Sequence, residues 1–127
     1  MASMEALNCL EITDGIAIHR PVGEVTLPRA VQSVVTAITS AREHEIRKLL
    51  TVLTGLTGFP SPGVAARYQL VKDGAAASGG LVRVAMVIRP EMFDPQKIGV
   101  LVGRHIGLVC DVFISEPEAM AWLRGLG

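Results

Sequence analysis

The segment that most constrains the fold is the almost continuously apolar run LLTVL at residues 49–53, which is followed by a loop rich in Gly, Thr and Pro. Such a run has no polar face, so it predicts a strand buried on both sides at the centre of a parallel sheet. A helix start follows the loop, so residues 49–68 hold a strand, a loop and a helix in turn. Ligands collect at the carboxyl ends of strands in open α/β sheets, so we expect any site in this segment.

The rest of the chain alternates short apolar runs with segments of helical periodicity. The predicted strands span residues 7–12, 16–20, 46–53, 81–88 and 108–114. Asp14-Gly15 is typical of a hairpin turn between the first two, and the later connections are long enough for crossover helices. The order ββαβαβαβα predicts an α/β fold, with a five-stranded, mostly parallel sheet, an N-terminal antiparallel hairpin and about four helices. A length of 127 residues predicts one domain, residues 1–127.

Short polar side chains mark the predicted helix starts, as N-cap residues do. The predicted N-caps are Thr26, Ser61, Asp94 and Ser115. Ser61 and Asp94 are each followed by a proline, which the first helical position tolerates. Ser115 begins a capping-box pattern that ends at Glu118.

The third predicted helix has two features of interest. One face of it carries Ile98, Leu101, Val102 and His105. Gly99 and Gly103 lie four residues apart in the same helix, and their small size favours close approach of a neighbouring helix or strand. Space for a ligand, or a small-residue contact in a dimer, is the alternative interpretation.

The charge balance excludes some classes of partner. Lys plus Arg and Asp plus Glu both number 12, and only five residues are aromatic, so nothing favours binding to a nucleic-acid backbone or to bases. Zero net charge also permits self-association. The N-terminus lacks the pattern of a signal peptide, and no apolar run approaches the ~18 residues of a membrane span. We therefore expect a cytoplasmic protein without a membrane span.

The histidines and cysteines do not form a recognisable site. No two of His19, His44 and His105 have metal-ligand spacing, so surface or capping roles are expected and no metal or other cofactor is predicted. Cys9 and Cys110 are predicted on opposite edges of the sheet, too far apart for a disulfide. Both are expected to be small buried hydrophobic side chains with reduced thiols.

The loop after the central strand contains most of the candidate site, namely Thr54, Gly55, Thr57 and Gly58. The glycines form a G-x-x-G spacing between a strand and a helix, a context in which helix N–H groups bind anions. The segment lacks both the G-x-G-x-x-G pattern and the Lys-Ser/Thr pair of a P-loop. A tight turn that needs a positive φ is the structural alternative.

Ser61 and Arg89 complete the candidate site. Ser61 is expected to cap a helix, or to be a regulatory hydroxyl whose phosphate the helix dipole would stabilise. Arg89 follows a parallel strand, so it reaches the same end of the sheet and could hold a carboxylate or phosphate, unless it pairs with Glu91 or Asp94. Arg67, Tyr68 and Arg104 are expected to be solvated or snorkelling side chains, as Arg89 is if it holds no ligand.

Four segments carry a family resemblance: RKLLTVLTGLTG, ARYQLV, RVAMVIRPEMFDPQKIGVLVGRHIGL and DVFISEPEAMAWL. With the opening hairpin they cover nearly the whole chain. The chain resembles the STAS domain of bacterial anti-sigma-factor antagonists, and more closely the SpoIIAA-like proteins of uncharacterised function. The resemblance implies strands that neighbour one another in sequence order, in a layout similar to that of the CRAL-TRIO lipid-binding domains.

The regulatory motif of the antagonists is altered here. In those proteins D-S-S-G opens the second helix, and an anti-sigma kinase phosphorylates its second serine. The matching residues are Pro60, Ser61, Pro62 and Gly63, so Pro60 replaces the aspartate and Pro62 occupies the phosphoserine position. Only Ser61 matches a serine, so the resemblance implies the fold without the phospho-switch.

These observations favour a non-catalytic module that is regulatory or binds another protein. An enzyme is disfavoured because no histidine or carboxylate pair is placed for acid–base work. The alternative is a binder of a small apolar or anionic ligand between sheet and helices, which needs a cavity of about 300 Å³ or more. A homodimer would be expected if apolar side chains stay partly exposed, the candidates being Met92, Phe93, Phe113 and Trp122.

Overall fold

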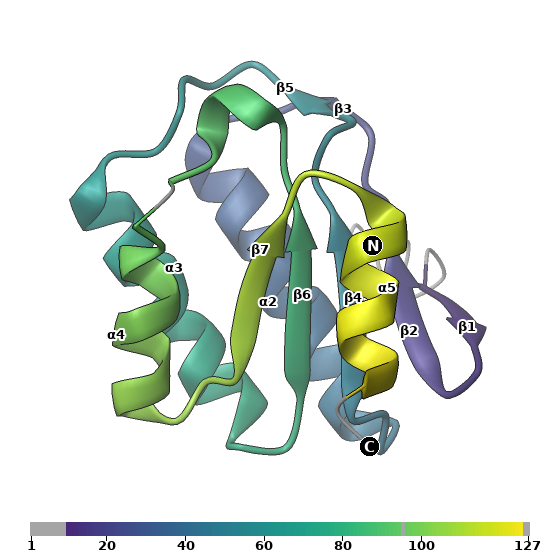
Figure 1. Cartoon of the computed structure of the whole chain (residues 1–127). Coiled ribbons are helices and arrows are strands. Elements are labelled where there is room, and N and C mark those ends of the chain that lie inside the picture. Colours follow the sequence, from purple (N-terminus) through teal and green to yellow (C-terminus); the bar gives the residue numbers. More distant parts are fainter. Residues whose placement is uncertain (1–9, 95, 126–127) are drawn as a thin grey trace.

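The computed structural model describes residues 10–94 and 96–125 and has the predicted α/β architecture (Figure 1). The main sheet has the strand order β1-β2-β4-β6-β7. Its strands are β1 (Leu10–Thr13), β2 (Ile16–His19), β4 (Lys48–Val52), β6 (Arg83–Val87) and β7 (Cys110–Phe113). β1 and β2 are antiparallel, and every other neighbouring pair is parallel. The strands therefore neighbour one another in sequence order, as the resemblance implies.

The opening hairpin turns at the predicted dipeptide. Asp14 and Gly15 both have positive φ, 54° and 75°, which is the backbone of a type I′ turn. Four residue pairs join the two strands, from Leu10 opposite His19 to Thr13 opposite Ile16. The predicted first strand also included residues 7–9, which lie outside the described residues.

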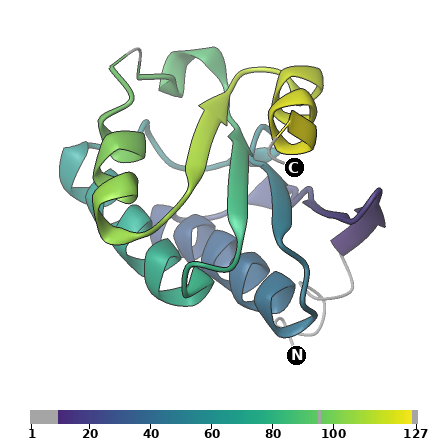
Figure 2. The ribbon, with the colours of Figure 1, turned by 60° about the horizontal axis from the view of Figure 1, so that its bottom comes forward.

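Helices cover both faces of the sheet (Figures 1 and 2). The helices are α2 (Leu27–Glu43), α3 (Val64–Ser78), α4 (Ile98–Ile106) and α5 (Glu116–Gly125). α2, α3 and α4 lie on one face, and α5 lies on the other. Among the described residues, no helix has both the length and the apolar character needed to cross a membrane.

The alternation of side chains along β4 explains its uninterrupted apolar run. Leu49 belongs to the core beneath α2, α3 and α4, whereas Leu50 and Val52 belong to the core beneath α5. All three side chains are buried, and Thr51 between them is fully buried as well. The prediction of a central strand covered on both sides is therefore confirmed.

Two of the four predicted helix starts are confirmed by their side-chain bonds. Thr26 Oγ1 accepts a hydrogen bond from Arg29 N at 3.4 Å, at the start of α2. Ser115 Oγ accepts one from Glu118 N at 3.4 Å, at the start of α5. Both bonds satisfy an amide that has no partner within its helix.

The other two predicted helix starts are wrong. α3 begins at Val64 after the extended Gly63, so Ser61 is not its N-cap. α4 begins at Ile98 after Lys97, so Asp94 is not its N-cap either. Asp94 instead forms a local turn, in which its Oδ1 accepts from Gln96 N at 3.0 Å and its carbonyl from Lys97 N at 3.0 Å. Such local bonds compete with helix initiation, which a sequence pattern does not show.

The residues that the sequence groups on one face of α4 are buried only in part. Leu101 is 53% exposed and His105 is exposed, whereas Val100 and Gly103 are buried. A Cβ on Gly103 would lie 3.2 Å from the carbonyl oxygen of Leu108 and 3.4 Å from Val71 Cγ1. Gly103 therefore allows α4 to approach its neighbours closely, which confirms the packing interpretation for this glycine.

Candidate functional site

The predicted site loop pairs with another loop in a second, two-stranded sheet that the sequence did not reveal. β3 (Gly23–Glu24) and β5 (Leu56–Thr57) are parallel and lie above the carboxyl ends of the main strands (Figure 1). Gly23 N donates to Gly55 O at 3.1 Å, and Val25 N donates to Thr57 O at 2.8 Å. The side chains of Thr54 and Thr57 are exposed at this end of the molecule.

Close backbone approach explains both glycines of the loop. A Cβ on Gly55 would lie 3.0 Å from Pro21 O. Gly58 has a φ of 99°, and a Cβ on it would lie 2.7 Å from Val25 O. The turn interpretation is thus confirmed for Gly58, whereas anion binding by the loop stays a prediction.

Arg89 lies beneath this loop and bonds to its backbone. Its Nη2 donates to Leu56 O at 2.9 Å, and its Nε lies 3.7 Å from Glu91 Oε1. Nε is buried and has no hydrogen-bond partner among the described residues. Arg89 therefore reaches the same end of the sheet as Thr54, where it supports the loop and pairs with Glu91.

Arg67 is the functional candidate that the sequence prediction missed. Its Nε donates to Pro62 O at 2.8 Å, and its Nη2 donates to Met92 O at 3.0 Å and to Ser61 Oγ at 3.3 Å. The side chain, which was expected to be solvated or snorkelling, is half-buried, and its guanidinium bonds to two backbone carbonyl groups. A signal was present, because Arg67 lies three and four residues before Leu70 and Val71 and so shares their inward helix face.

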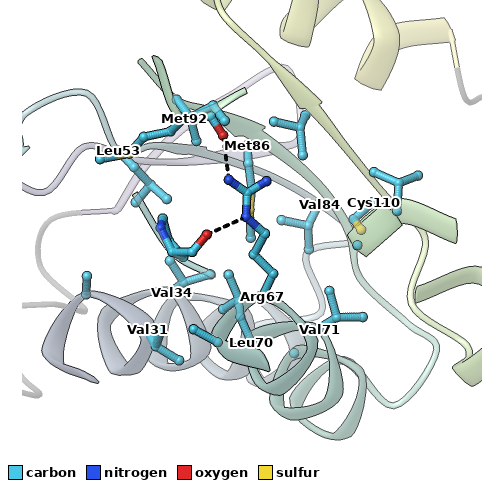
Figure 3. A pocket seen from close by; sticks show the side chains of 18 of the residues that line it. Val31, Val34, Leu53, Arg67, Leu70, Val71, Val84, Met86, Met92 and Cys110 are labelled. Carbon is cyan, nitrogen blue, oxygen red and sulfur yellow. Dashed lines mark hydrogen bonds between the residues drawn. The ribbon is translucent and has the colours of Figure 1, made fainter. Parts of the chain in front are cut away.

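Beneath Arg67 lies a cavity of about 140 Å³ between the sheet and α2, α3 and α4, which we call the inner cavity (Figure 3). Apolar side chains make up most of its wall; among them are Val31, Val34, Leu53, Leu70, Val71, Val84 and Met86. Three charged residues also line it, Arg67, Asp94 and Lys97. Its volume is below the roughly 300 Å³ set for a drug-sized ligand and resembles cavities that hold one benzene molecule.

A second depression lies outside the inner cavity and shares four residues with it, Pro62, Arg67, Asp94 and Gly99. We call it the outer groove. Its remaining wall consists of Gly63, Val64, Tyr68, Phe93 and Val102. Val64 is 71% exposed and Tyr68 is 48% exposed. The start of α3 and the segment before α4 thus present an open apolar surface.

His19 is a core residue rather than the predicted surface residue. It is 2% exposed, with Nδ1 2.8 Å from Thr51 Oγ1 and Nε2 3.1 Å from Ser33 Oγ. Burial lowers the pKa of His19 to about 4. Its two hydroxyl partners satisfy the hydrogen-bonding groups of a neutral ring. The prediction of a surface histidine was wrong because residues distant in sequence enclose this end of the strand.

Cys110 is buried, as predicted, and lines the inner cavity. Burial first, and then the nearby Asp111, raise the pKa of Cys110 to about 11, so its thiol stays protonated near neutral pH. Cys9 lies outside the described residues. Within the described part of the chain, no group of three or more His, Cys, Asp or Glu side chains could hold a metal ion.

Comparison with known proteins gives a likeness of structure. No family model matches the sequence, and no curated protein matches it. An anti-sigma factor antagonist from Mycobacterium paratuberculosis matches over 91% of each chain, with a TM-score of 0.58 and 16% identity. A proposed anti-sigma factor antagonist from Thermotoga maritima matches over 91% of this chain and 92% of its own, with a TM-score of 0.50 and 19% identity.

At 16% and 19% sequence identity, these matches show similarity of fold and nothing further. The strand order, the opening hairpin and the helices on both faces all agree with the resemblance found in the sequence. The chain therefore has the STAS fold of the anti-sigma factor antagonists.

Proposed function

We propose that the chain forms one STAS-like domain, a non-catalytic regulatory module that binds another protein through the outer groove. The observation that carries this proposal is the exposed apolar surface of Val64 and Tyr68 at the start of α3. Exposed apolar side chains gathered on one surface mark interaction sites more often than scattered ones do. The solved structures of similar fold support a regulatory role by analogy.

The buried titratable groups support a role without catalysis. Catalytic acids and bases have perturbed pKa values and face a cleft. His19 has a lowered pKa but lines neither the inner cavity nor the outer groove. Cys110 does line the inner cavity, but its pKa is raised, which keeps the thiol protonated and unreactive.

Ser61 is a candidate for regulation of this surface. Its side chain is exposed next to the groove, and its Oγ lies 3.3 Å from Arg67 Nη2. A phosphate on Ser61 would add about two negative charges beside that guanidinium and would strengthen the contact. The Ser61 hydroxyl does not cap α3, contrary to the prediction, because the N-cap residue of this helix is Gly63.

Affinity purification from the source organism tests the protein-binding proposal. We expect one specific partner, identified by mass spectrometry and then purified, to bind the full chain with an affinity that Val64→Asp weakens at least about tenfold. Leu81→Asp is the matched control, because Leu81 is 56% exposed but lies outside the groove. Light scattering of the purified chain shows whether a second copy is the partner.

Two results would count against the proposal. If Val64→Asp and Leu81→Asp affect the partner equally, the outer groove is not the binding surface. If the wild-type chain recovers no partner, remains monomeric and carries no phosphate on Ser61 in its host, the regulatory function itself is wrong.

A further inference from the structure

The inner cavity is apolar except at the end where the guanidinium of Arg67 lies (Figure 3). This cation is surrounded by neutral acceptors, the carbonyl oxygens of Pro62 and Met92 and the hydroxyl of Ser61. It forms no ion pair with a described residue, and its Nη1 has no hydrogen-bond partner among them. A guanidinium has five N–H donors, so Arg67 keeps donors available to a bound group.

The other charges at the cavity wall restrict which group that is. Lys97 is already used, because its Nζ lies 2.7 Å from Asp111 Oδ1. Asp94 also lines the cavity, and its Oδ1 accepts a hydrogen bond from Gln96 N at 3.0 Å, so it adds no positive charge to the wall. Arg67 can neutralise one negative charge of a ligand, whereas a dianion such as phosphate would bring a second charge without a partner into a largely apolar cavity. The charges therefore favour a monoanion.

The volume limits the rest of the ligand. A cavity of about 140 Å³ is close in size to an engineered apolar cavity that binds benzene. It therefore has room for roughly six carbon atoms in contact with the aliphatic wall. A carboxylate is a monoanion that accepts strong charge-assisted hydrogen bonds, and the two N–H donors of Arg67 Nη1 remain for it because Nε and Nη2 already bond to the protein.

We propose that the inner cavity is a binding site for a small apolar monocarboxylate. The carboxylate lies on Arg67, and the ring or short alkyl chain lies among side chains such as Val31, Leu70 and Val84. Arg67 then contacts the ligand and also links residues 61–62 to Met92 through its hydrogen bonds. This proposal does not depend on the protein-binding function, because it concerns the purified chain without a partner.

Methyl NMR spectra of the full chain test the proposal with benzoate as the probe. We expect benzoate to shift the methyl signals of Val31 and Val84 with a dissociation constant of about 1 mM or below, and to leave Val64 unaffected. Benzamide keeps the ring without the charge and should bind at least about tenfold more weakly. Acetate keeps the charge without the ring and should not shift these signals.

Three variants separate ligand contact from structural support. Arg67→Gln should weaken benzoate at least about tenfold while benzamide binding stays unchanged, because the cavity persists without the cation. Ala66→Leu should weaken both probes, because Ala66 lines the cavity and the larger side chain occupies it. Arg104→Gln is the control, since Arg104 is exposed on α4 and lines neither depression.

Several results would overturn the proposal. If benzoate shifts no methyl signal of the inner cavity, the cavity does not bind it. The same conclusion follows if benzoate shifts only signals of the outer groove, such as that of Val64. Equal effects of benzoate and acetate mean non-specific anion binding. If Arg67→Gln does not fold, the comparison of benzoate with benzamide and the Ala66→Leu variant still decide the outcome. Failure of the protein-binding proposal leaves these spectra unchanged.

Discussion

The two faces of the sheet are covered in different ways. α5 packs directly on one face, where Ala119 and Leu123 are fully buried and the Phe113 and Trp122 rings lie 5.8 Å apart. α2, α3 and α4 cover the other face, and three helices leave the inner cavity between them and the strands. No residue of α5 lines that cavity or the outer groove.

The same faces differ in polarity. The four buried polar side chains among the described residues are His19, Ser40, Thr51 and Ser78, and they belong to α2 and α3 or to strand positions that face them. The buried cluster beneath α5 is aliphatic. One face therefore supplies tight apolar packing, while the other holds the buried polar groups and the empty volume where a ligand or a switch can act.

The same truncation on the two faces gives the largest expected contrast. Leu123→Ala should lower the free energy of unfolding by about 3 kcal/mol, because it empties a fully packed position. Leu70→Ala, at the wall of the inner cavity, should cost only about 1 kcal/mol because Leu70 is half-buried beside existing space. Urea unfolding of both variants measures the difference. Equal losses would mean that the faces are packed alike.

Acid should destabilise the polar face through His19. Its folded pKa of about 4 lies below the ordinary 6.5, so the unfolded chain binds the proton more readily between these values. The contribution is present above pH 6.5 and is lost as the pH falls through 4, by about 3 kcal/mol in all. Urea unfolding at pH 7.5 and 4.5 should show this loss, and His19→Gln should lack it. An equal pH dependence in the variant would assign the loss to other groups.

The loop above the polar face depends on Gly58. Gly58→Ala should cost about 2 kcal/mol, because its φ of 99° disfavours a side chain and the new Cβ would lie 2.7 Å from Val25 O. The change should also displace the adjacent Phe59 from the wall of the inner cavity. Thermal unfolding measures the cost, with Gly125→Ala as a control that has nothing within 4 Å of its new Cβ. A similar loss in both variants would contradict this role.

Added volume should have opposite effects on the two faces. Ala66→Leu should raise the free energy of unfolding by about 0.5 kcal/mol, because it partly fills the inner cavity. Ala119→Leu should lower it by about 2 kcal/mol, since Ala119 is fully buried beneath α5. Both substitutions keep good helix formers, so propensity does not explain the contrast. Destabilisation by Ala66→Leu would show that the polar face is fully packed as well.

Local patterns predicted much of the architecture. The turn at Asp14-Gly15, the capping residues Thr26 and Ser115, and the central strand at residues 49–53 all depend on neighbours in sequence. Each involves either a short-range hydrogen bond or an apolar run whose burial needs no knowledge of the partner. These predictions therefore agree with the structure.

The candidate site depended on contacts that sequence spacing does not contain. Ser61 has the residue type of a helix cap, yet Arg67, six positions later, binds its hydroxyl and the next carbonyl instead. Gly55 and Gly58 were predicted to bind an anion or to form a tight turn, and their contacts with the segment around β3, some thirty positions earlier, could not be read from the sequence. The inner cavity exists only because three helices meet around it.

The sequence by itself determined the order of strands and helices, the hairpin, and which strand lies at the centre, because hydrophobic period and turn chemistry act over a few residues. Tertiary structure alone decided that His19 is neutral and enclosed, that α4 packs closely at Gly103, and that Arg67 lines an apolar cavity. These features depend on the desolvation and close approach of distant segments, which only the assembled fold produces.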